Sequence, residues 1–166
     1  GVKAATRIEW DKIYAIEMVE DVAPGNTPLF KVVNRLDDLP EVIASFEDME
    51  MEIVVKPQGL TGGKGVKVMP EHLPSYLDAL AYAEELINQN EPVLIVEKLN
   101  GIEFTIMGLT DGQDLVLAPP TYDYPFRFED DKGPGTGGMG CFTGPDGQLP
   151  FLNDDDIDVC KSLMQK

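Results

Sequence analysis

Positive charge and long apolar runs are both scarce in this sequence. Its 166 residues contain 13 Lys and Arg against 30 Asp and Glu, a formal net charge of −17. Nucleic-acid binding draws most of its affinity from basic side chains, so this balance argues against a nucleic-acid-binding or basic membrane-surface protein. No run of about 18 apolar residues is present to span a bilayer, and residues 1–12 lack the apolar core of a signal peptide. We therefore expect a cytoplasmic protein with no membrane partner.

Residues that bind metals or form disulfides are also few. Cys141 and Cys160 are the only cysteines, too few for a disulfide scaffold, so we expect reduced thiols without a chemical role. His72 is the only histidine, and a metal site would need further His or Cys. The acidic run 154–156 is more typical of a first helical turn than of a metal site. We therefore predict no metal site in this chain.

A folded core is nevertheless expected. The sequence is 43% hydrophobic and 8% aromatic, which is too apolar for a disordered acidic chain. A chain of this length can build one ordinary domain with a core. Its periodicities alternate between helical and strand-like, which indicates an α+β fold.

Helical spacing appears in four segments. Thr6 and Glu9 fit a capping box for a helix over residues 7–20, with Trp10 on its apolar face. Asp37 and Asp38 are expected to cap a second helix. The third helix is predicted over residues 73–88, and the fourth begins after a cap at Asn153 and Asp154. The apolar positions of the last three helices are Leu39, Val42, Ile43, Phe46; Leu73, Leu77, Leu80, Ile87; and Ile157, Cys160, Met164.

Strand-like segments fill most of the remaining chain, except for one long stretch. They are residues 29–33, 52–56, 65–69, 93–99, 101–109 and 115–119. The last three are predicted to be neighbouring antiparallel strands. Residues 119–150 are rich in proline and glycine and are predicted to be loop, which at this length indicates a functional segment or disorder.

A glycine-rich segment at residues 57–65 is the first candidate for chemistry. Its glycines leave backbone N–H groups unshielded, so they can close around phosphate oxygens, and Lys64 adds a mobile charge. A Walker A loop would instead open a helix with Ser or Thr after the lysine, whereas Gly65 follows here and a strand continues. We predict a hairpin tip over phosphates. The alternative is a plain glycine hairpin with solvated lysines.

Two further segments carry charged residues at strand ends. Lys56 ends an apolar strand, where its ammonium can reach an anion; the alternative is an exposed strand terminus. Glu97 and Glu103 flank a turn after the next apolar strand. A carboxylate such as Glu103 can accept hydrogen bonds from ribose hydroxyls, and the backbone near Leu99 can contact an adenine edge. Alone, this second arrangement is weak, because acidic residues are common at turns.

Three blocks together carry a resemblance to a known family. In order and spacing, VVKPQGLTGGKGVKV (54–68), VLIVEKLNGIEFTI (93–106) and KGPGTGGMGCF (132–142) resemble the phosphoribosylamine–glycine ligases of the ATP-grasp superfamily. The third block is the most specific. The resemblance implies a lid subdomain of antiparallel sheet with helices and the first part of the second ATP-grasp subdomain. It divides the chain into a helical segment leading into the ATP-grasp region (1–51), the lid (52–119), and a substrate loop with the start of the second subdomain (120–166).

The resemblance also implies roles for individual residues. Lys56 and Lys64 would contact ATP phosphates, with a flap of three glycines. Glu97 and the Leu99 backbone would contact adenine, and Glu103 the ribose. The glycines of the flap are Gly62, Gly63 and Gly65; the residues implied for glycine and phosphoribosylamine are Asp123, Arg127, Thr136, Gly137 and Gly138. Many members have Asp-His-Lys-Arg where this chain has residues 123–127, Asp-Tyr-Pro-Phe-Arg, so the role of Arg127 stays open.

The implied reaction is a step of purine biosynthesis. ATP, with Mg²⁺ or Mn²⁺, phosphorylates glycine, and the amine of phosphoribosylamine displaces phosphate, with no protein nucleophile. The family's amino-terminal domain and downstream metal-binding strands have no counterpart in these residues, so we expect a central fragment that is inactive alone. Alternatives are another ATP-grasp carboxylate–amine ligase, against which TGGMG argues, or a nucleotide-binding module without chemistry.

Overall fold

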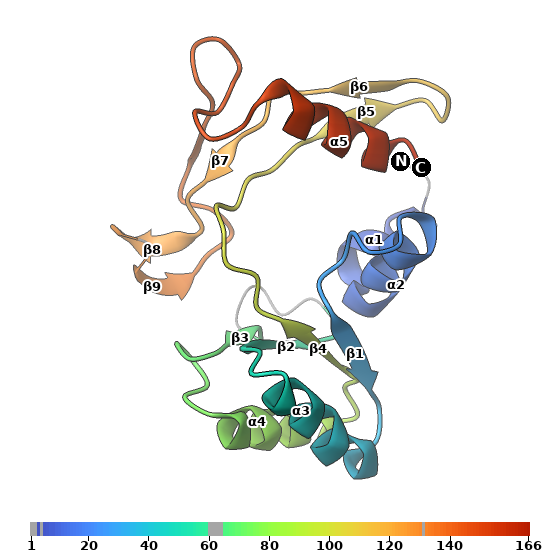
Figure 1. Cartoon of the computed structure of the whole chain (residues 1–166), viewed down its shortest axis with the longest axis vertical. Coiled ribbons are helices and arrows are strands. Elements are labelled where there is room, and N and C mark those ends of the chain that lie inside the picture. The colour runs from blue at the N-terminus through green and yellow to red at the C-terminus, as the bar shows by residue number, and fades with distance from the viewer. Residues whose placement is uncertain (1–2, 4, 60–64, 131) are drawn as a thin grey trace. The chain divides into compact units, whose positions relative to one another are not determined.

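The chain forms two compact units, residues 1–100 and residues 101–166. The computed structural model describes residues 3, 5–59, 65–130 and 132–166 (Figure 1). Each unit is an α+β arrangement with antiparallel strand pairing, as the sequence predicts. The expected functional division of the chain at residues 52 and 120 stays a prediction.

A four-stranded antiparallel sheet is the centre of the first unit. Its order is β1-β4-β2-β3, with β1 at Phe30–Val33, β4 at Val93–Glu97, β2 at Ile53–Pro57 and β3 at Lys67–Val68. Strand β4 pairs with β1 through Phe30 opposite Val96, and with β2 through Ile53 opposite Glu97. The strands predicted at 29–33, 52–56 and 93–99 are confirmed, and the one at 65–69 is shorter than expected.

Helices cover both faces of this sheet. Helices α3 (Leu39–Asp48) and α4 (Tyr76–Asn88) pack on the face that contains Ile53, Val55 and Ile95. Helix α2 (Lys12–Val22) packs on the opposite face, through Ile13 against Leu94 and Val96. Figure 1 shows α3 and α4 together on one side of the sheet and α2 on the other. Strand β4 is therefore buried on both sides, which explains why its sequence is a continuous apolar run.

The predicted helix over residues 7–20 is interrupted. Helix α1 (Arg7–Trp10) ends before Asp11, whose backbone is extended at φ −109° and ψ 91°. The capping box predicted from Thr6 and Glu9 is wrong, because the Thr6 hydroxyl donates to the Lys3 carbonyl instead. Trp10 is 48% exposed, so its expected place in the core is also wrong.

Helices α3 and α4 begin differently from the prediction. A 3₁₀ helix, η1 (Leu36–Asp38), leads into α3, and neither aspartate provides a side-chain cap. Leu39, Ile43 and Phe46 are buried as predicted. The buried side of α4 consists of Ala79, Ala83 and Leu86, whereas Leu77, expected to face the core, is 74% exposed. Ser75 caps α4, and the buried Leu73 precedes the helix.

Short strand pairs form most of the second unit. Strand β5 (Gly108–Thr110) pairs with β6 (Leu115–Leu117), β7 (Tyr122–Asp123) with β10 (Cys141–Phe142), and β8 (Phe126–Phe128) with β9 (Lys132–Gly135). The predicted sheet of three neighbouring strands is wrong, because β4 pairs with β1 and β2 in the first unit. The stretch 119–150, expected to be loop, contains four of these short strands.

The last helix, α5 (Asp154–Met164), begins as predicted. Asn153 and Asp156 form a capping box, and Asp154–Asp156 lie in its first turn. Both cysteines are free thiols. His72 accepts a hydrogen bond at Nδ1 from the Val68 N–H. In the described part of the chain, none of the helices combines the length and apolar character that crossing a membrane requires.

Asp11 joins helix α2 to the segment that follows β2. Its side chain is 2% exposed and accepts hydrogen bonds from the Tyr14 N–H at 3.0 Å and from Gln58 Nε2 at 3.0 Å. Arg7 forms an ion pair with it at 2.9 Å. The Lys12 N–H also donates to the Gln58 carbonyl at 3.2 Å. The start of the glycine-rich segment is thus held against the first turn of α2.

The ionised form of Asp11 is stabilised by these contacts. Burial acts to raise the pKa of Asp11, but hydrogen bonds from Gln58, Tyr14 and Arg7 and the charge of Arg7 outweigh it, so the pKa is lowered. A folded-state pKa below the unfolded one adds stability above the unfolded value, about 3.9, and this stability is lost as the pH falls through the folded value.

We predict that Asp11→Asn lowers the free energy of unfolding by about 1–3 kcal/mol at neutral pH, because the amide keeps the cap but loses the charged partner of Arg7. The deficit should begin to narrow as the pH falls below about 4, and it should be lost as the pH falls through the lowered folded-state pKa of Asp11. Urea unfolding of the complete protein at several pH values measures the loss of unfolding free energy and its dependence on pH. Asp37→Asn, at an exposed aspartate, is the control and should change stability by about 0.5 kcal/mol or less. A deficit independent of pH would show that the charge is not the stabilising feature.

Candidate functional site

The predicted site residues fall into two groups, one in each compact unit. Lys56, Gly65, Glu97 and Leu99 belong to the first unit. The other described residues of the predicted site belong to the second, namely Glu103, Asp123, Arg127, Thr136, Gly137 and Gly138. Gly62, Gly63 and Lys64 lie outside the described residues.

Lys56 lies on the face of the sheet that α2 covers. It is the fourth residue of β2, is half-buried, and pairs across the ladder with Leu94. Residues directly opposite in an antiparallel pair point to the same face, and Leu94 packs with Ile13 of α2. Its neighbours on β2, Val55 and Pro57, are buried, so the strand holds Lys56 next to the start of the glycine-rich segment at residue 57.

Side chains from α2 and α4 bind Gly59 and Gly65, the described residues that border residues 60–64. Lys12 of α2 donates through Nζ to the Gly59 carbonyl. Tyr82 of α4 donates its hydroxyl to the Gly65 carbonyl at 2.8 Å. The Lys67 ammonium lies 3.7 Å from the centre of the Tyr82 ring, a cation–π contact that fixes the ring. Strand β3 follows this segment, as predicted, whereas a Walker A loop would be followed by a helix.

Glu97 and Leu99 lie where β4 leaves the sheet. Glu97 is the last residue of β4 and is half-buried, whereas Leu99 is 66% exposed. The residue between them, Lys98, donates its backbone N–H to the Glu52 carbonyl at 2.7 Å. The segment therefore stays attached to the sheet up to Lys98 and becomes accessible at Leu99.

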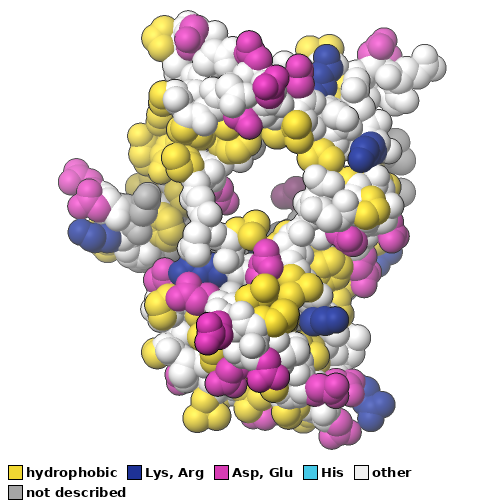
Figure 2. Space-filling model, in the orientation of Figure 1, with side chains coloured by type: hydrophobic (Ala, Val, Ile, Leu, Met, Phe, Trp, Pro, Cys, Tyr) yellow, Lys and Arg dark blue, Asp and Glu magenta, His cyan; other side chains and the backbone are white. Residues whose placement is uncertain are grey.

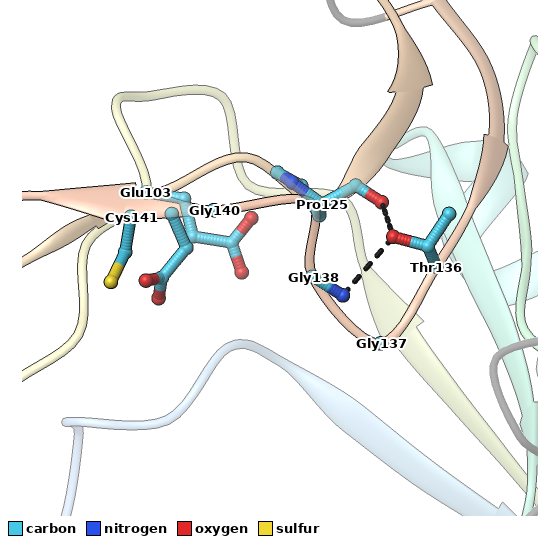
Figure 3. Close-up of a pocket in the computed structure, with 8 residues that line it drawn as sticks. Glu103, Pro125, Thr136, Gly137, Gly138, Gly140 and Cys141 are labelled. Atoms are coloured by element: carbon cyan, nitrogen blue, oxygen red, sulfur yellow. Dashed lines mark hydrogen bonds between the residues drawn. The ribbon is translucent and has the colours of Figure 1, made fainter.

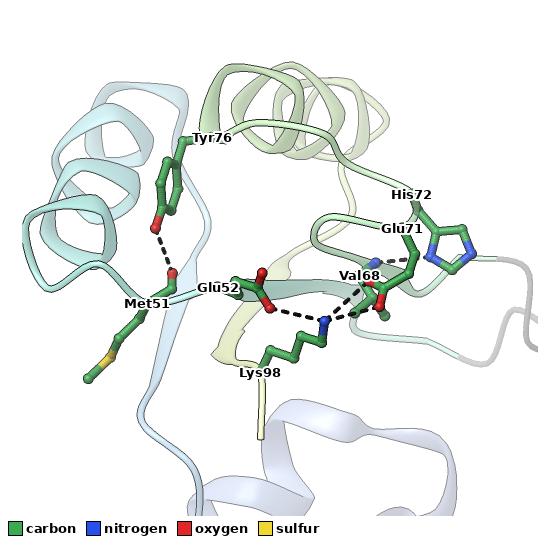
Figure 4. A network of polar contacts seen from close by, with 7 residues as sticks. All are labelled: Met51, Glu52, Val68, Glu71, His72, Tyr76 and Lys98. Carbon is green, nitrogen blue, oxygen red and sulfur yellow. Dashed lines mark hydrogen bonds and ion pairs between the residues drawn. The ribbon is translucent and has the colours of Figure 1, made fainter. Parts of the chain in front are cut away.

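Lys98 also carries the main ion-pair cluster of the first unit (Figure 4). Its ammonium lies 3.0 Å from Glu52 Oε2 and 3.1 Å from Glu71 Oε1. Burial acts to lower the pKa of Lys98, but hydrogen bonds to Glu52 and Glu71 outweigh this and raise it. Burial acts to raise the pKa of Glu71, and hydrogen bonds and the Lys98 charge lower it on balance. Both pKa shifts favour the charged forms of Lys98 and Glu71.

The second group surrounds a pocket of about 520 Å³ within the second unit (Figure 3). Two carboxylates, those of Glu103 and Asp123, line it together with a glycine-rich turn. Figure 3 shows Glu103 on one side of the pocket and the turn on the other. The remaining lining residues are Pro125, Thr136, Gly137, Gly138, Gly140 and Cys141. Paired carboxylates give this pocket an acidic wall.

Asp123 is fixed by two threonines that the sequence did not single out. The Thr105 hydroxyl donates to Asp123 Oδ2 at 2.5 Å, and the Thr121 hydroxyl to Oδ1 at 3.4 Å. Thr105 and Thr121 face each other in an isolated antiparallel bridge. Only the alternating pattern of residues 101–109, which placed Thr105 on a strand, pointed toward this contact.

The glycine-rich turn is held by Thr136. Its hydroxyl donates to the Pro125 carbonyl at 2.9 Å and accepts from the Gly138 N–H at 3.0 Å. Gly138 has φ +114°, a left-handed conformation that side chains rarely adopt, which explains a glycine there. The third sequence block thus forms a defined wall of the pocket.

Arg127 does not line this pocket. It borders a second pocket of about 450 Å³ with an aromatic wall that includes Tyr122 and Tyr124. Its guanidinium lies 5.9 Å from the Phe128 ring centre. The structure therefore groups five predicted residues around the first pocket and places Arg127 apart from them.

No described group of three or more His, Cys, Asp or Glu residues is arranged to hold a metal ion. Glu103 and Asp123 supply two carboxylates, and Mg²⁺ is usually held by one or two carboxylates together with waters and substrate phosphates. The described residues therefore form no all-protein metal cage.

Known proteins resemble this chain along nearly its whole length. A sequence model of the family described as phosphoribosylglycinamide synthetase, ATP-grasp (A) domain, matches residues 11–166. The phosphoribosylamine–glycine ligase of Methanothermobacter thermautotrophicus is 40% identical over 98% of this chain and 37% of its own length. That of Thermococcus kodakarensis is 42% identical over 94% of this chain and 36% of its own. The chain spans a little over a third of these relatives.

Solved structures show the same fold. The phosphoribosylamine–glycine ligase of Thermotoga maritima superposes with a TM-score of 0.82 at 30% identity, over 99% of this chain and 40% of that one. D-alanyl-alanine synthetase A of Vibrio cholerae superposes with a TM-score of 0.70 at 12% identity, over 99% of this chain and 47% of that one, which supports the fold alone. The family match covers nearly the whole chain, with the three motif blocks inside it. The chain therefore belongs to the phosphoribosylglycinamide synthetase ATP-grasp (A) domain family.

Proposed function

We propose that the protein containing this chain is an ATP-dependent ligase that joins glycine to 5-phosphoribosylamine, forming glycinamide ribonucleotide, ADP and phosphate. The observation that carries this proposal is the family match over residues 11–166, with relatives named phosphoribosylamine–glycine ligase. In this proposal the chain supplies part of the nucleotide site and part of the substrate site of a longer, cytoplasmic enzyme of purine biosynthesis.

The first unit contributes the ATP contacts in this proposal. Lys56 neutralises phosphate charge together with Lys64, and the glycines at 62, 63 and 65 let the backbone approach the phosphates. Glu97 and the exposed Leu99 segment contact the adenine. The contacts from Lys12 and Tyr82 to Gly59 and Gly65 support this assignment, because they fix the described neighbours of the loop.

The second unit contributes an acidic substrate pocket in this proposal. Glycine carries an ammonium group, and the carboxylates of Glu103 and Asp123 can pair with it. Because Thr105 and Thr121 hold Asp123, its carboxylate is already oriented before a ligand arrives. The motif implies that Glu103 contacts the ribose, whereas its place in the pocket supports a contact with glycine. The proposal keeps both roles for Glu103. Arg127 has no assigned substrate contact.

The proposed reaction needs no protein nucleophile. A carboxylate oxygen of glycine attacks the γ-phosphorus of ATP, ADP leaves, and an acyl phosphate results. The amine nitrogen of phosphoribosylamine then attacks the acyl carbon, phosphate leaves, and the nitrogen loses a proton. A bound Mg²⁺ supplies charge neutralisation in such transfers. The protein's own part is to position the reactants and to exclude water from the acyl phosphate.

A second candidate is another ATP-grasp carboxylate–amine ligase. The likeness to D-alanyl-alanine synthetase A shows that this fold accommodates such enzymes, but at 12% identity it assigns no substrate. The Thr136–Gly140 turn favours the glycine ligase, because it lies in the block most specific to that family. Formation of glycinamide ribonucleotide by the complete protein with ATP, glycine and phosphoribosylamine tests the choice directly.

We predict that Lys56→Met in the complete protein slows ligation by about a hundredfold, the scale seen when one charge-stabilising group is lost. Adenosine binding should change little, because in this proposal the removed ammonium contacts the phosphates of the nucleotide and not its adenosine. Steady-state kinetics and adenosine titration measure the two effects. Lys31→Met, an exposed lysine on β1, is the matched control and should behave like wild type. Equal loss of adenosine and ATP affinity in Lys56→Met would contradict the assignment.

The two free cysteines provide a second test. Cys141 lines the acidic pocket and is exposed, whereas Cys160 lies on α5 and is half-buried. We predict that saturating glycine slows alkylation of Cys141 by iodoacetamide several-fold, because the ligand covers the thiol, and leaves Cys160 unaffected. Mass spectrometry of labelled peptides gives both rates. If glycine leaves the Cys141 rate unchanged, while the ligase reaction is still observed, glycine binds elsewhere.

A further inference from the structure

The ion-pair cluster at Lys98 continues the ladder between the two central strands. Ile53 of β2 pairs with Glu97 of β4, so the next opposing pair is Glu52 with Lys98. The Lys98 N–H donates to the Glu52 carbonyl at 2.7 Å, and its ammonium lies 3.0 Å from Glu52 Oε2. Lys98 therefore bonds to β2 through both its backbone and its side chain, one residue beyond the end of β4.

A third strand is held by the same ammonium. Glu71 follows β3, and its Oε1 and Oε2 lie 3.1 and 3.3 Å from Lys98 Nζ. The Met69 N–H donates to the Ile53 carbonyl at 3.0 Å, so this turn is already attached to the start of β2. Figure 4 shows Lys98 pointing between Glu52 and Glu71. One side chain thus joins the ends of β4, β2 and β3 in their order in the sheet.

This cluster differs from the exposed ion pairs of the chain. The Lys98 side chain is 18% exposed and its partners Glu52 and Glu71 are 45% and 57% exposed, whereas both partners in the Arg35–Asp37 and Lys132–Asp130 pairs are more than two-thirds exposed. Partial burial weakens screening by solvent and salt. Without the ammonium, Glu52 and Glu71 would face each other as two negative charges and separate.

We propose that Lys98 is a positioning residue for the adenine end of the nucleotide. It lies between the two residues proposed to contact adenine, Glu97 and Leu99. Its bonds fix that segment against β2, the strand that carries Lys56. The spacing between the adenine contacts and the phosphate contact then depends on the cluster. This inference rests on the proposed ATP site, although Lys98 itself contacts no ligand through its side chain.

The test compares nucleotide selectivity in the complete protein. Lys98→Met keeps the length of the side chain but removes its charge. We expect ATP affinity to fall about threefold to tenfold, the scale of one partly buried ion pair. GTP affinity should fall less, so the ATP-to-GTP ratio declines. KM for ATP should rise, while kcat and KM for glycine should stay near the wild-type values. Lys98→Arg should restore the ratio.

Two controls separate positioning from general damage. Lys31→Met removes a lysine from β1 of the same sheet and should leave the ratio unchanged. Glu71→Gln removes one partner of the cluster and should lower the ATP-to-GTP ratio in the same direction as Lys98→Met, but less. Thermal unfolding of each variant establishes that it is folded under the assay conditions.

The outcomes distinguish this inference from the proposed function. An unchanged ATP-to-GTP ratio in a folded Lys98→Met variant overturns the positioning role, as does an equal rise in KM for ATP and glycine. If the wild-type protein binds ATP selectively but forms no glycinamide ribonucleotide, the proposed ligase reaction fails. Equilibrium binding of ATP and GTP to the same variants then still decides the role of Lys98.

Discussion

Burial of β4 on both faces is the constraint on which the first unit depends. Val93 to Val96 are all at most 2% exposed, with α3 and α4 packed on one face and α2 on the other. A strand enclosed in this way has no interior position for a polar side chain, because burying an unpaired polar group is costly. Polar residues therefore collect near the ends of the central strands: Lys56 is the next-to-last residue of β2, Glu97 is the last residue of β4, and Lys98 follows it. The candidate nucleotide contacts of the first unit are a consequence of this core.

Local patterns predicted the elements of the first unit well, but not their breaks or partners. The runs at 29–33, 52–56 and 93–99 became strands because their apolar character is itself the cause of burial. The break at Asp11 depends in part on Gln58, 47 residues away, which local patterns cannot show, in addition to the local contacts from Tyr14 and Arg7. The partners of β4 were assigned by sequence proximity to residues 101–119, whereas the core pairs it with β1 and β2. In the proline- and glycine-rich stretch, strands of two to four residues are too short for any periodicity to show.

In the candidate site too, motifs predicted which residues take part, whereas the contacts that hold those residues became known only from the structure. Glu103 lies in the second sequence block and the Thr136–Gly138 turn in the third, and the structure brings both together with Asp123 around the acidic pocket. The residues that hold the candidate site segments were missed, because they act through partners far along the chain. Thr105 holds Asp123 in the pocket, whereas Asp11 binds Gln58 and Lys98 binds Glu71 within the first unit. The family resemblance grouped Arg127 with Asp123 and left its role open, and strand β8 places it at the second pocket.

The net charge of −17 poses a question for a protein proposed to bind an anionic nucleotide. Acidic side chains are spread over the visible surface (Figure 2). At physiological ionic strength, charges more than about 8 Å apart at the surface are largely screened, so the local set of charges dominates a site. Three lysines lie near the described ends of the glycine-rich segment: Lys12 binds the Gly59 carbonyl, Lys67 lies over Tyr82, and Lys56 lies on β2, with Glu91 near Lys12 and Glu85 near Tyr82. Since contacts to the protein hold Lys12 and Lys67 in place, their positive charge stays beside this segment. The excess of acidic residues and an anion site at the end of β2 are therefore compatible.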